Sequence, residues 1–380
     1  MDFELSETHR SVRDAARAFA EREVAPYARA WDEEERFPSE IVPKLGAVGF
    51  LGIRIPEEYG GAGLDTLSYA IIVEEIARVD GSLALTVASH NGLGSSHIMT
   101  FGNEAQKRKY LPRLATGEIL GAWALTEPGS GSDAAGMATR AVRDGGDWVI
   151  DGTKTFITQG SVGGVCVVLA LTAPEKKQHG VTAFAVEMGT LGFTASRHIE
   201  KLGCRSSDTV ELTLEGVRVP DSQRIGGVDH GFVDTLRILD RGRVSIGAMA
   251  LGLGEGALGA ALRYAKDRKQ FGRPIADFQA VQWMLADSRM ELDAARMLLW
   301  RAAVLADGSE RYSKEASMAK LYCSEAASRA CNRALQVHGG YGYTREFPVE
   351  RHLRDAKLCE IGEGTSEIQR IVISRQILRG

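Results

Sequence analysis

The sequence predicts an α+β protein that is mostly α, with three domains in the order helical, β and helical. We expect an N-terminal helical domain at residues 1–120, a central antiparallel β-domain at 121–230 and a C-terminal four-helix-bundle domain at 231–380. Apolar residues recur at helical spacing up to about residue 114, short strand-like segments with turn residues between them follow Gly121, and long helical periodicity resumes at Gly231. At 380 residues the chain is long enough for two or three domains with substantial cores.

The N-terminal helices are predicted from apolar residues at helix-like spacing with charges between them. The first set is Val12, Ala16, Phe19, Val24, Tyr27 and Trp31, and further helices are expected from about Ser39, at 66–79, at 83–101 and at 105–114. The segment Ile55–Gly63 contains a proline and three glycines, so it interrupts regular structure.

The β-domain is predicted from turn chemistry between short apolar segments. Asp144-Gly145-Gly146 and Asp151-Gly152 predict chain reversals that separate three strands of a meander. The strands that we expect are 123–126, 139–143, 147–150, 154–157, 165–171, 182–187, 209–214 and 217–220. A loop rich in Gly and Ser, Glu127–Asp133, follows the first of them.

The C-terminal domain is predicted from apolar stripes on long helices. Phe278, Val281, Leu285, Leu292, Ala295, Leu299 and Ala302 form one stripe, and Ala316, Ala319, Cys323, Ala326, Ala330, Ala334 and Val337 form a small-residue face for close packing. The segment Gly254–Gly259 fits the pattern G-x-G-x-x-G, but no strand precedes it and the chain has no βαβ alternation. We therefore reject a dinucleotide fingerprint and expect these glycines to serve close helix–helix contact, since glycine disfavours a helix.

Composition excludes several classes of function. A net charge of −4 with both signs interspersed argues against nucleic acid or an anionic membrane as the main partner. The five cysteines are odd in number and show no ligand spacing, so we expect no disulfide framework and no metal site. The acidic N-terminal stretch has no apolar run of signal-peptide type, and no segment reaches membrane-spanning length, so we expect a reduced, cytoplasmic protein without membrane insertion.

The most distinctive candidate residue is Glu363, which lies between two glycines directly before a strong helix start. Ser366 and Gln369 have the spacing of a capping box, so a helix N-terminus is expected to hold the turn. Flanking glycines allow close approach of a ligand, which suits a general base. An isolated Glu-Gly pair is nevertheless more often a solvated loop, and the other motifs have to decide.

Each of the other motifs has a structural alternative. The loop between Thr126 and Ser132 could bind a polar ring or a phosphate, although such loops are more often plain turns. Arg268 could reach a phosphate or could interact with a helix dipole. Gln336–Tyr343 contains more glycines than a helix stop needs, which suggests ligand approach, whereas His338 alone is more often packed or capping than catalytic. His90-Asn91 is equally consistent with a pocket and with the surface.

Taken together, these segments resemble the acyl-CoA dehydrogenase family over essentially the whole chain. The segments that carry the resemblance occur in family order at 55–63, 125–133, 154–160, 268–274, 336–343, 348–357 and 363–370. One of them would be weak support, but seven in order with family-like spacing are specific. The resemblance implies the acyl-CoA dehydrogenase fold, FAD between the β-domain and the C-terminal bundle, an acyl-CoA substrate, an electron-transfer flavoprotein as electron acceptor and a homotetramer.

The resemblance also implies a role for individual residues. Glu363 matches the catalytic base, and the alternative position that some members use on an earlier helix corresponds to Gly242, which cannot act as one. Three groups of positions match FAD contacts. The group around the flavin ring is Leu125, Thr126, Phe156 (often tryptophan in relatives), Ile157 and Thr158, with Thr158 near N5. The group that would reach FAD across a subunit interface is Arg268, Phe271, Gln279, Gln336, Val337, His338, Gly339 and Gly340, and the group next to the base is Thr365, Ser366 and Glu367. Substrate positions are Ser132, Asp240 and Arg243 for the CoA moiety, together with Gly364.

The implied reaction is α,β-dehydrogenation of a thioester to a trans-2-enoyl-CoA. Glu363 would take the α-proton while the β-hydrogen leaves as hydride to flavin N5. The Glu363 N–H and a flavin ribityl hydroxyl would stabilise the charge on the thioester oxygen, and such donors are typically worth about two to three decades in rate each. Burial should raise the pKa of Glu363.

Substrate class and rival functions stay open at this point. Gly362 stands where many relatives have tyrosine, so either the pocket is open to branched or cyclic chains or a neighbouring side chain fills the gap. No arginine is evident around Ser89–Gly94, so a second substrate carboxylate is not expected, and short or medium straight or branched chains are. The alternatives are a flavin monooxygenase or nitroalkane-oxidase-like enzyme on the same fold and a non-catalytic acyl-CoA-binding relative. The Glu-Gly-Thr context of Glu363 and the retained FAD positions argue against both.

Overall fold

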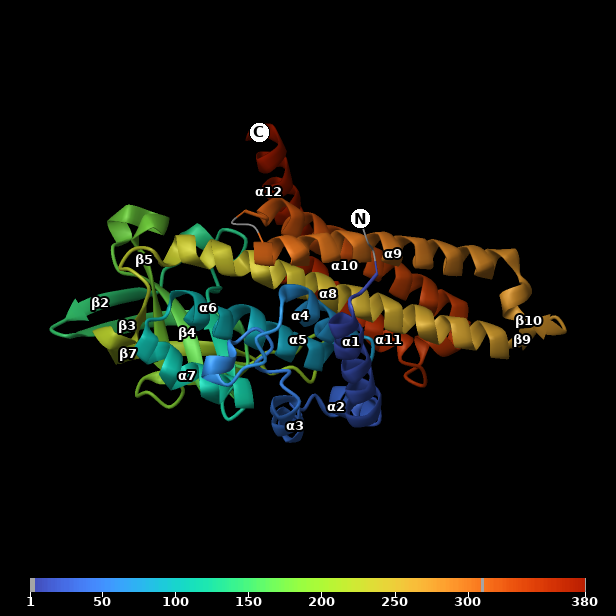
Figure 1. The fold of residues 1–380 in the computed structure, drawn as a ribbon, viewed down its shortest axis with the longest axis horizontal. Helices are drawn as coiled ribbons and strands as arrows, with labels where there is room; N and C mark the ends of the chain where they lie inside the picture. Colours follow the sequence, from blue (N-terminus) through green and yellow to red (C-terminus); the bar gives the residue numbers. More distant parts are fainter. Residues whose placement is uncertain (1–3, 309–310, 380) are drawn as a thin grey trace.

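The computed structural model describes residues 4–308 and 311–379, so residues 1–3 of the acidic N-terminal stretch lie outside the described part. Its chain forms a helical layer, a β-domain and a long bundle of antiparallel helices, in the predicted order (Figure 1). The β-domain lies at one end of the molecule, and the β9–β10 hairpin (Lys269–Gln270 and Arg273–Pro274) lies at the other end of the bundle. The expected helical–β–helical fold is confirmed.

The N-terminal helices begin at side-chain caps that the sequence supplies. Ser6, Asp65, Asp80 and Asn103 each accept a hydrogen bond from a backbone N–H in the first turn of the helix that follows, and Asn103 forms a full capping box with Gln106. The helical segments are α1 Glu7–Phe19, η1 Ala20–Val24, α2 Ala28–Glu34, η2 Ser39–Ile41, α3 Val42–Ala47, η3 Glu57–Tyr59, α4 Thr66–Ala77, α5 Gly81–Ser89, η4 His90–Ser95, α6 Ser96–Phe101 and α7 Glu104–Thr116.

The β-domain is a mixed sheet and not the purely antiparallel one that the sequence predicted. Its strands are β1 Gly121–Ala124, β2 Arg140–Asp144, β3 Asp147–Thr158, β4 Val165–Leu171, β5 Val181–Glu187, β6 Phe193–His198, β7 Thr209–Pro220 and β8 Arg224–Ile225, in the order β6-β7-β3-β2-β4-β5-β8 with β1 beside β4. β1 pairs with β4 in parallel, as β2 does through one residue pair. Turn residues identify neighbouring antiparallel strands, but strands that are distant in sequence meet only in the folded sheet.

One predicted turn is wrong. β3 continues straight through Asp151-Gly152, and its pairing with β7 shifts register between Ile150 and Gly152. Gly152 has φ 154°, and a Cβ there would lie 2.4 Å from Thr139 Oγ1. The glycine therefore serves a β-bulge with a close approach of β2, and not a chain reversal.

The C-terminal helices pack along α8, which is the central element of the bundle (Figure 1). The segments are α8 Gly231–Asp267, η8 Ile275–Asp277, α9 Gln279–Gly308, α10 Ser313–His338, η9 Gly339–Tyr343, α11 Val349–Ile361 and α12 Ser366–Arg379. The small-residue face of α10 is buried as expected, from Ala316 to Val337. Small side chains on this face and the glycines of α8 allow the two backbones to approach closely.

α8 has the length and apolar composition of a membrane-crossing helix, with a mean hydropathy of 1.4 over its most apolar window. Among the described residues it is the only helix with these properties, and 83% of that window is buried inside the protein. Burial against α4, α10 and α11 accounts for its composition.

Hydrogen bonds to α11 and α5 are among the contacts that fix the β-domain against the helices. Cys204 N donates a hydrogen bond to Asp355 Oδ1 on α11 (2.6 Å), and Gln159 Nε2 at the end of β3 donates to Thr86 O on α5 (3.0 Å).

Because β1 begins at Gly121 and α8 begins at Gly231, we propose domain limits of 1–120, 121–230 and 231–380.

The glycines of the G-x-G-x-x-G segment lie inside α8, as the rejection of a nucleotide loop requires. A Cβ on Gly256 would lie 2.2 Å from Arg78 O and 2.4 Å from His352 Nε2, whereas one on Gly259 would meet nothing closer than Arg263 at 3.6 Å. Only the first of these two glycines is required by packing.

Gly256→Ala and Gly259→Ala are therefore a matched pair. We expect Gly256→Ala to lower the free energy of unfolding by about 1–3 kcal/mol, because backbone atoms must move apart. Gly259→Ala should raise it by up to about 1 kcal/mol, because alanine favours a helix and no clash opposes it. Thermal and denaturant unfolding of both variants would measure this, and an equal effect of the two changes would contradict the packing account.

Candidate active site

Glu363 lies on a short turn between α11 and α12 in which two successive residues have left-handed backbone conformations. Glu363 has φ 54° and Gly364 has φ 95°. The Gly364 carbonyl accepts hydrogen bonds from Lys320 Nζ (2.7 Å) and Gln369 Nε2 (2.8 Å). A non-glycine residue in this conformation is uncommon and is kept only where its surroundings hold it.

The capping box predicted for Ser366 and Gln369 is not formed. Thr365, one residue earlier, caps α12 through a long contact from Ile368 N (3.4 Å). The Ser366 hydroxyl is buried and has no hydrogen-bond partner in the described part of the chain. Gln369 turns back to the carbonyls of Glu363 and Gly364 instead of the backbone N–H of the cap residue. The Gln369 side chain therefore stabilises the turn by donating to its carbonyl groups. The spacing of Ser366 and Gln369 alone could not distinguish this arrangement from a capping box.

The Glu363 carboxylate packs directly on the backbone of α8 at Gly242. A Cβ on Gly242 would lie only 1.7 Å from Glu363 Oε2, so any side chain at this position would displace the carboxylate. Oε2 is buried and has no hydrogen-bond partner among the described residues. Desolvation raises the pKa of Glu363 to about 7, against a smaller opposing effect of the Lys320 and Arg243 charges.

The backbone N–H of Glu363 is also unused, since none of the described residues accepts a hydrogen bond from it. One residue thus offers an acceptor and a donor that the protein itself does not satisfy. Buried polar atoms are normally paired, so the buried, free Oε2 beside an unused N–H indicates a place where a ligand makes hydrogen bonds.

The segment η4 connects Glu363 to the β-domain. Leu93 Cδ2 lies 3.1 Å from the Cβ position of Gly242, and a Cβ on the neighbouring Gly94 would lie 2.9 Å from the carbonyl carbon of Gly121 in β1. On the α4 side, the buried Tyr69 hydroxyl donates to Ala88 O (2.7 Å). Tight packing across η4 places the start of β1 close to the Glu363 turn.

The two sequence segments expected around a flavin ring do lie side by side. Lys154 Nζ, fully buried, donates to Leu125 O (3.1 Å) and pairs with Glu127 (2.8 Å), and Thr155 N donates to Thr126 O (2.9 Å). The Glu127 carboxylate in turn accepts from the N–H groups of residues 138 and 139. The segment 125–127 is therefore fixed against β3 by a buried ion pair.

At the end of β3 the protein leaves an aromatic ring uncovered. Phe156 is 64% exposed and has φ 58°, while Ile157 beside it is buried and Thr158 is half-buried. An exposed ring on a constrained backbone next to ordered polar groups fits a surface that binds a flat, partly apolar ligand. Ser132 is exposed on the neighbouring loop.

Asp240 and Arg243, expected to contact CoA, form an ion pair that is almost buried on α8. Asp240 also accepts a hydrogen bond from the Ser313 hydroxyl at the start of α10, and Arg243 Nε is buried without a partner. The pair lies on the same stretch of α8 as Gly242. It is thus close to Glu363, although little of it faces solvent.

A second group of expected cofactor residues lies at the opposite end of the bundle. Arg268 and Gln279 are exposed, Phe271 is 93% exposed, and Gln336, Gly339 and Gly340 are exposed at the end of α10. At about 1.5 Å per residue, the helix from Gly242 to Arg268 is about 40 Å long, so this group cannot meet Glu363 within one chain (Figure 1).

The structure shows the surroundings of the two histidines for which the sequence left alternatives, His338 and His90. His338 is buried, stacks on Tyr264 with ring centroids 4.3 Å apart, and contacts Ala334 O through Nδ1 (2.8 Å), so its packing and capping interpretation fits. His90 and Asn91 are buried, so the surface alternative is wrong for both. His90 accepts from Gly121 N (3.1 Å), and Asn91 donates to the Phe50 and Val87 carbonyls (3.0 Å each).

Sequence reasoning missed the two buried lysines that hold the site. Lys320 lies on the small-residue face of α10, four residues after Ala316, where a lysine is expected to face solvent. The position of Lys320 within that small-residue face was the signal that could have predicted its burial. A buried lysine in turn predicts a specific partner, because burying an unpaired charge is costly. Lys154 lay within a recognised segment but was given no role.

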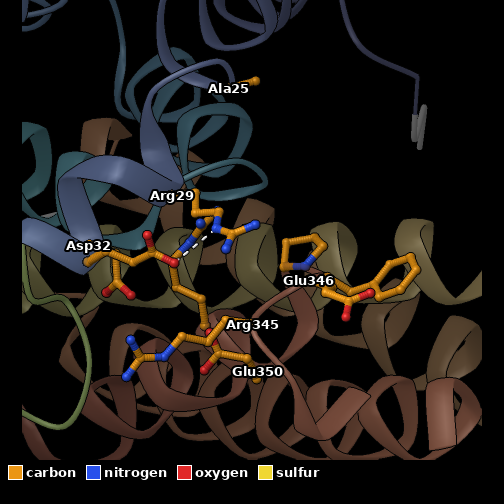
Figure 2. Close-up of a pocket in the computed structure, with 10 residues that line it drawn as sticks. Ala25, Arg29, Asp32, Arg345, Glu346 and Glu350 are labelled. Carbon is orange, nitrogen blue, oxygen red and sulfur yellow. Dashed lines mark hydrogen bonds and ion pairs between the residues drawn. The ribbon is translucent and has the colours of Figure 1, made fainter. Parts of the chain in front are cut away.

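The pocket drawn in Figure 2 is a different feature. It has a volume of about 200 Å³ and lies between α2 and the start of α11, where Arg29 pairs with Glu33 at 2.9 Å. Glu363 lies beyond the other end of α11, about 20 Å away along the helix axis. Two other carboxylates of this pocket, Asp32 and Glu350, pair with Arg354. The pocket shares no residue with the Glu363 turn. No group of three or more potential metal ligands occurs among the described residues.

Three protein-family profiles match consecutive parts of the chain. They are "Acyl-CoA dehydrogenase, N-terminal domain" at residues 6–118, "Acyl-CoA dehydrogenase, middle domain" at 122–217 and "Acyl-CoA dehydrogenase, C-terminal domain" at 229–378.

Curated proteins match over their full length. The chain is 48% identical over 380 residues to the probable acyl-CoA dehydrogenase YngJ of Bacillus subtilis, with 100% of both chains covered. It is 46% identical over 379 residues to the short-chain specific acyl-CoA dehydrogenase of Clostridium acetobutylicum, again with 100% of both covered.

Solved structures have the same fold throughout. Butyryl-CoA dehydrogenase from Megasphaera elsdenii superposes with a TM-score of 0.98 at 39% identity over 100% of both chains. A chain in a study of the electron transferring flavoprotein of Acidaminococcus fermentans gives 0.98 at 42% identity, also over 100% of both. An acyl-CoA dehydrogenase of Bacillus anthracis complexed with FAD gives 0.92 at 35% identity, covering 99% of this chain and 68% of that one.

The raised pKa of Glu363 predicts a pH-dependent effect on stability. The folded protein keeps the carboxyl protonated up to about pH 7, whereas a glutamate in the unfolded chain loses its proton near 4.5. The stabilising effect of the bound proton is complete below about 4.5 and is lost as pH rises through about 7. We expect Glu363→Gln to match the wild type in thermal unfolding at pH 4.5 and to exceed it above pH 7 by at most about 3 kcal/mol. A stability difference that is constant across this range would contradict the raised pKa.

Proposed function

Because the chain belongs to the acyl-CoA dehydrogenase family, we propose that it converts an acyl-CoA thioester to the trans-2-enoyl-CoA, with Glu363 as the base. The chain is a flavin-dependent oxidoreductase and its cofactor is FAD. The single observation that carries the assignment of the base is Glu363 Oε2, which is buried against Gly242 without a partner among the described residues, together with a carboxyl pKa raised to about 7. A base with a pKa near the working pH is the most effective.

The residues present fit FAD and a thioester. The uncovered ring of Phe156, the ordered backbone of 125–127 and the half-buried Thr158 would border the flavin ring, and bound FAD would supply the hydride acceptor. Glu363 removes the α-proton through its free carboxylate. Its unused N–H donates to the thioester oxygen as negative charge develops there, an effect worth about two to three decades in rate for such a donor.

The CoA moiety is proposed to pass Ser132, Asp240, Arg243 and Gly364, in agreement with the family positions. The buried Arg243 Nε has no partner in the described protein, which leaves one donor for a ligand. We also propose that Thr365, Ser366 and Glu367 contact FAD beside the base.

The remaining FAD contacts are proposed to come from a second copy of the chain in a homotetramer. Arg268, Phe271, Gln279 and the segment 336–340, which includes Val337 and His338, lie about 40 Å from the Glu363 turn, so they can reach a flavin only at another copy's β-domain. The nearly full exposure of Phe271 supports an interface there. We further propose an electron-transfer flavoprotein as the electron acceptor, which the neighbour studied with such a protein supports.

The acyl chain is proposed to be short, straight or branched. Gly362 has φ −65° and ψ 151°, which any residue adopts, and a Cβ there would meet only Leu358, at 3.5 Å or more. Neither backbone strain nor crowding therefore requires glycine, and the space beside the base stays open. No cationic residue occurs in 89–95 to hold a second substrate carboxylate, and the short-chain and butyryl-CoA relatives support a short substrate.

Glu363→Gln tests the reaction. The variant keeps the shape of the side chain and should purify with FAD bound, but butyryl-CoA added under anaerobic conditions should no longer bleach the flavin spectrum that it bleaches in the wild type. Glu325→Gln, which removes a surface carboxylate paired with Arg370, is the matched control and should bleach normally. Bleaching at the wild-type rate in Glu363→Gln would remove the assigned base. Rapid reoxidation of the reduced wild type by oxygen would favour the monooxygenase or oxidase alternative.

Gly362→Tyr tests the open space. We expect kcat/KM for isobutyryl-CoA to fall at least about tenfold more than kcat/KM for butyryl-CoA, because a ring would occupy the space of the branch. Gly362→Ala should change both values little. Equal losses for the two substrates would show that the gap does not select the acyl chain.

A further inference from the structure

Lys320 is a buried cation whose charge lowers the pKa of the proposed base, Glu363. None of the described carboxylates forms an ion pair with it. It is fully buried on α10, and its only hydrogen bond within the described residues runs from Nζ to Gly364 O at 2.7 Å. The other fully buried lysine, Lys154, is paired with Glu127. An unpaired buried ammonium is costly, so its place in the core requires an explanation.

Satisfying the Gly364 carbonyl does not explain it. Gln369 Nε2 already donates to this oxygen at 2.8 Å, and Gln369 is itself fully buried. Removing the lysine would therefore leave no orphaned acceptor. What Lys320 adds is a second, charged donor from a different helix, which fixes the direction of the Gly364 carbonyl relative to α10.

We propose that Lys320 is a positioning residue, whose ammonium holds the Gly364 carbonyl and thereby the left-handed turn that presents the Glu363 carboxylate and N–H to the substrate. The inference rests on the function proposed above. Two consecutive left-handed residues, one of them not glycine, require such external support. α10 is well placed to give it, because a Cβ on Gly247 of α8 would lie 3.7 Å from Lys320 Cα, so the lysine projects from a tightly packed interface.

The charge of Lys320 acts on Glu363 as well. Besides the Glu363 turn, the groups that influence the ammonium are Arg243 on α8 and Cys359 and Glu360 on α11; burial lowers the pKa of Lys320 to about 8. Arg243 is committed to Asp240 on α8, and Glu360 is committed to Lys357 and Ser328. Tyr69 on α4 faces Glu363 from the other side, and burial raises its pKa, so its hydroxyl stays neutral.

Lys320 therefore opposes the effect of burial on the base. Among the cations, Lys320 lowers the pKa of Glu363 more than Arg243 does. Between about pH 7 and pH 8 both the carboxylate and the ammonium are charged. Since the two groups interact, they titrate as a pair, and activity should rise with the ionisation of Glu363 and fall with the loss of the Lys320 proton.

The test is the pH profile of kcat/KM for butyryl-CoA in the FAD-loaded enzyme, with an artificial electron acceptor, for Lys320→Met, Lys320→Gln and Lys320→Arg. We expect a bell-shaped pH profile of kcat/KM in the wild type. Lys320→Met should lose about 100-fold at pH 7, as expected for a misplaced catalytic group. Lys320→Gln, which keeps a donor, should lose less. In both neutral variants, the fall of kcat/KM at high pH (the basic limb) should disappear, and its rise at low pH (the acidic limb) should shift to higher pH. Lys320→Arg should keep activity and also lack the basic limb. Lys314→Met, an exposed lysine on the same helix paired with Glu315, is the control and should follow the wild type.

A second readout does not depend on turnover. Infrared titration of the Glu363 carboxyl band, assigned by its absence in Glu363→Gln, should show the proton retained to higher pH in Lys320→Met than in the wild type. A Lys320→Met enzyme within about twofold of the wild type at every pH, with an unshifted band, would overturn the proposal. If both neutral variants fail to fold, persistence of the basic limb in Lys320→Arg would overturn it. Activity in Glu363→Gln would instead remove the proposed function, so the two failures are distinguishable.

Discussion

The contact between the Glu363 carboxylate and the bare backbone of Gly242 is the constraint on which the rest of the site depends. The turn between α11 and α12 must approach α8 closely enough to bury a carboxylate oxygen, and α8 must have no side chain at the point of contact. This contact removes the carboxylate from water, which raises its pKa to about 7 and makes it a useful base near neutral pH. The absence of a side chain at Gly242 makes room for the carboxylate of Glu363, the residue that we propose as the base.

Burial of that carboxylate requires a rigid turn, and the protein obtains rigidity from charged groups inside its core. Lys320 ties the turn to α10, and Lys154 with Glu127 ties the segment 125–127 to β3. In both cases a buried ammonium donates to a backbone carbonyl next to a proposed ligand contact. Apolar side chains would pack these places at lower cost in free energy, but they could not fix the direction of a carbonyl group.

The length of α8 is the reason why we propose that a second copy of the chain completes the site. α8 carries Gly242 near its start and Arg268 just beyond its end, and a straight helix keeps these two regions about 40 Å apart. Two aromatic rings are exposed, that of Phe156 near the end of β3 and that of Phe271 between β9 and β10. A cofactor that contacts both groups has to lie between copies of the chain, so association and cofactor binding would be linked.

The sequence by itself predicted the order of the domains, most helices and a glutamate on a glycine-flanked turn before the last helix, because periodicity, turn residues and ordered family motifs are local properties of the chain. The role of Glu363 as the base stays a prediction. Sequence reasoning failed where long-range contacts decide. Gly152 serves a bulge in the pairing of β3 with β7 and not a turn, and β1 joins the sheet in parallel. Gln369 supports the turn instead of capping α12, and His90 and Asn91 bond to backbone groups in the core. Only the tertiary structure revealed that Lys320 is buried and holds Gly364, because a lysine on a helix carries no sequence mark of the carbonyl that it will reach. Packing between elements distant in sequence sets which polar groups lose water, and that loss determines the chemistry of the site.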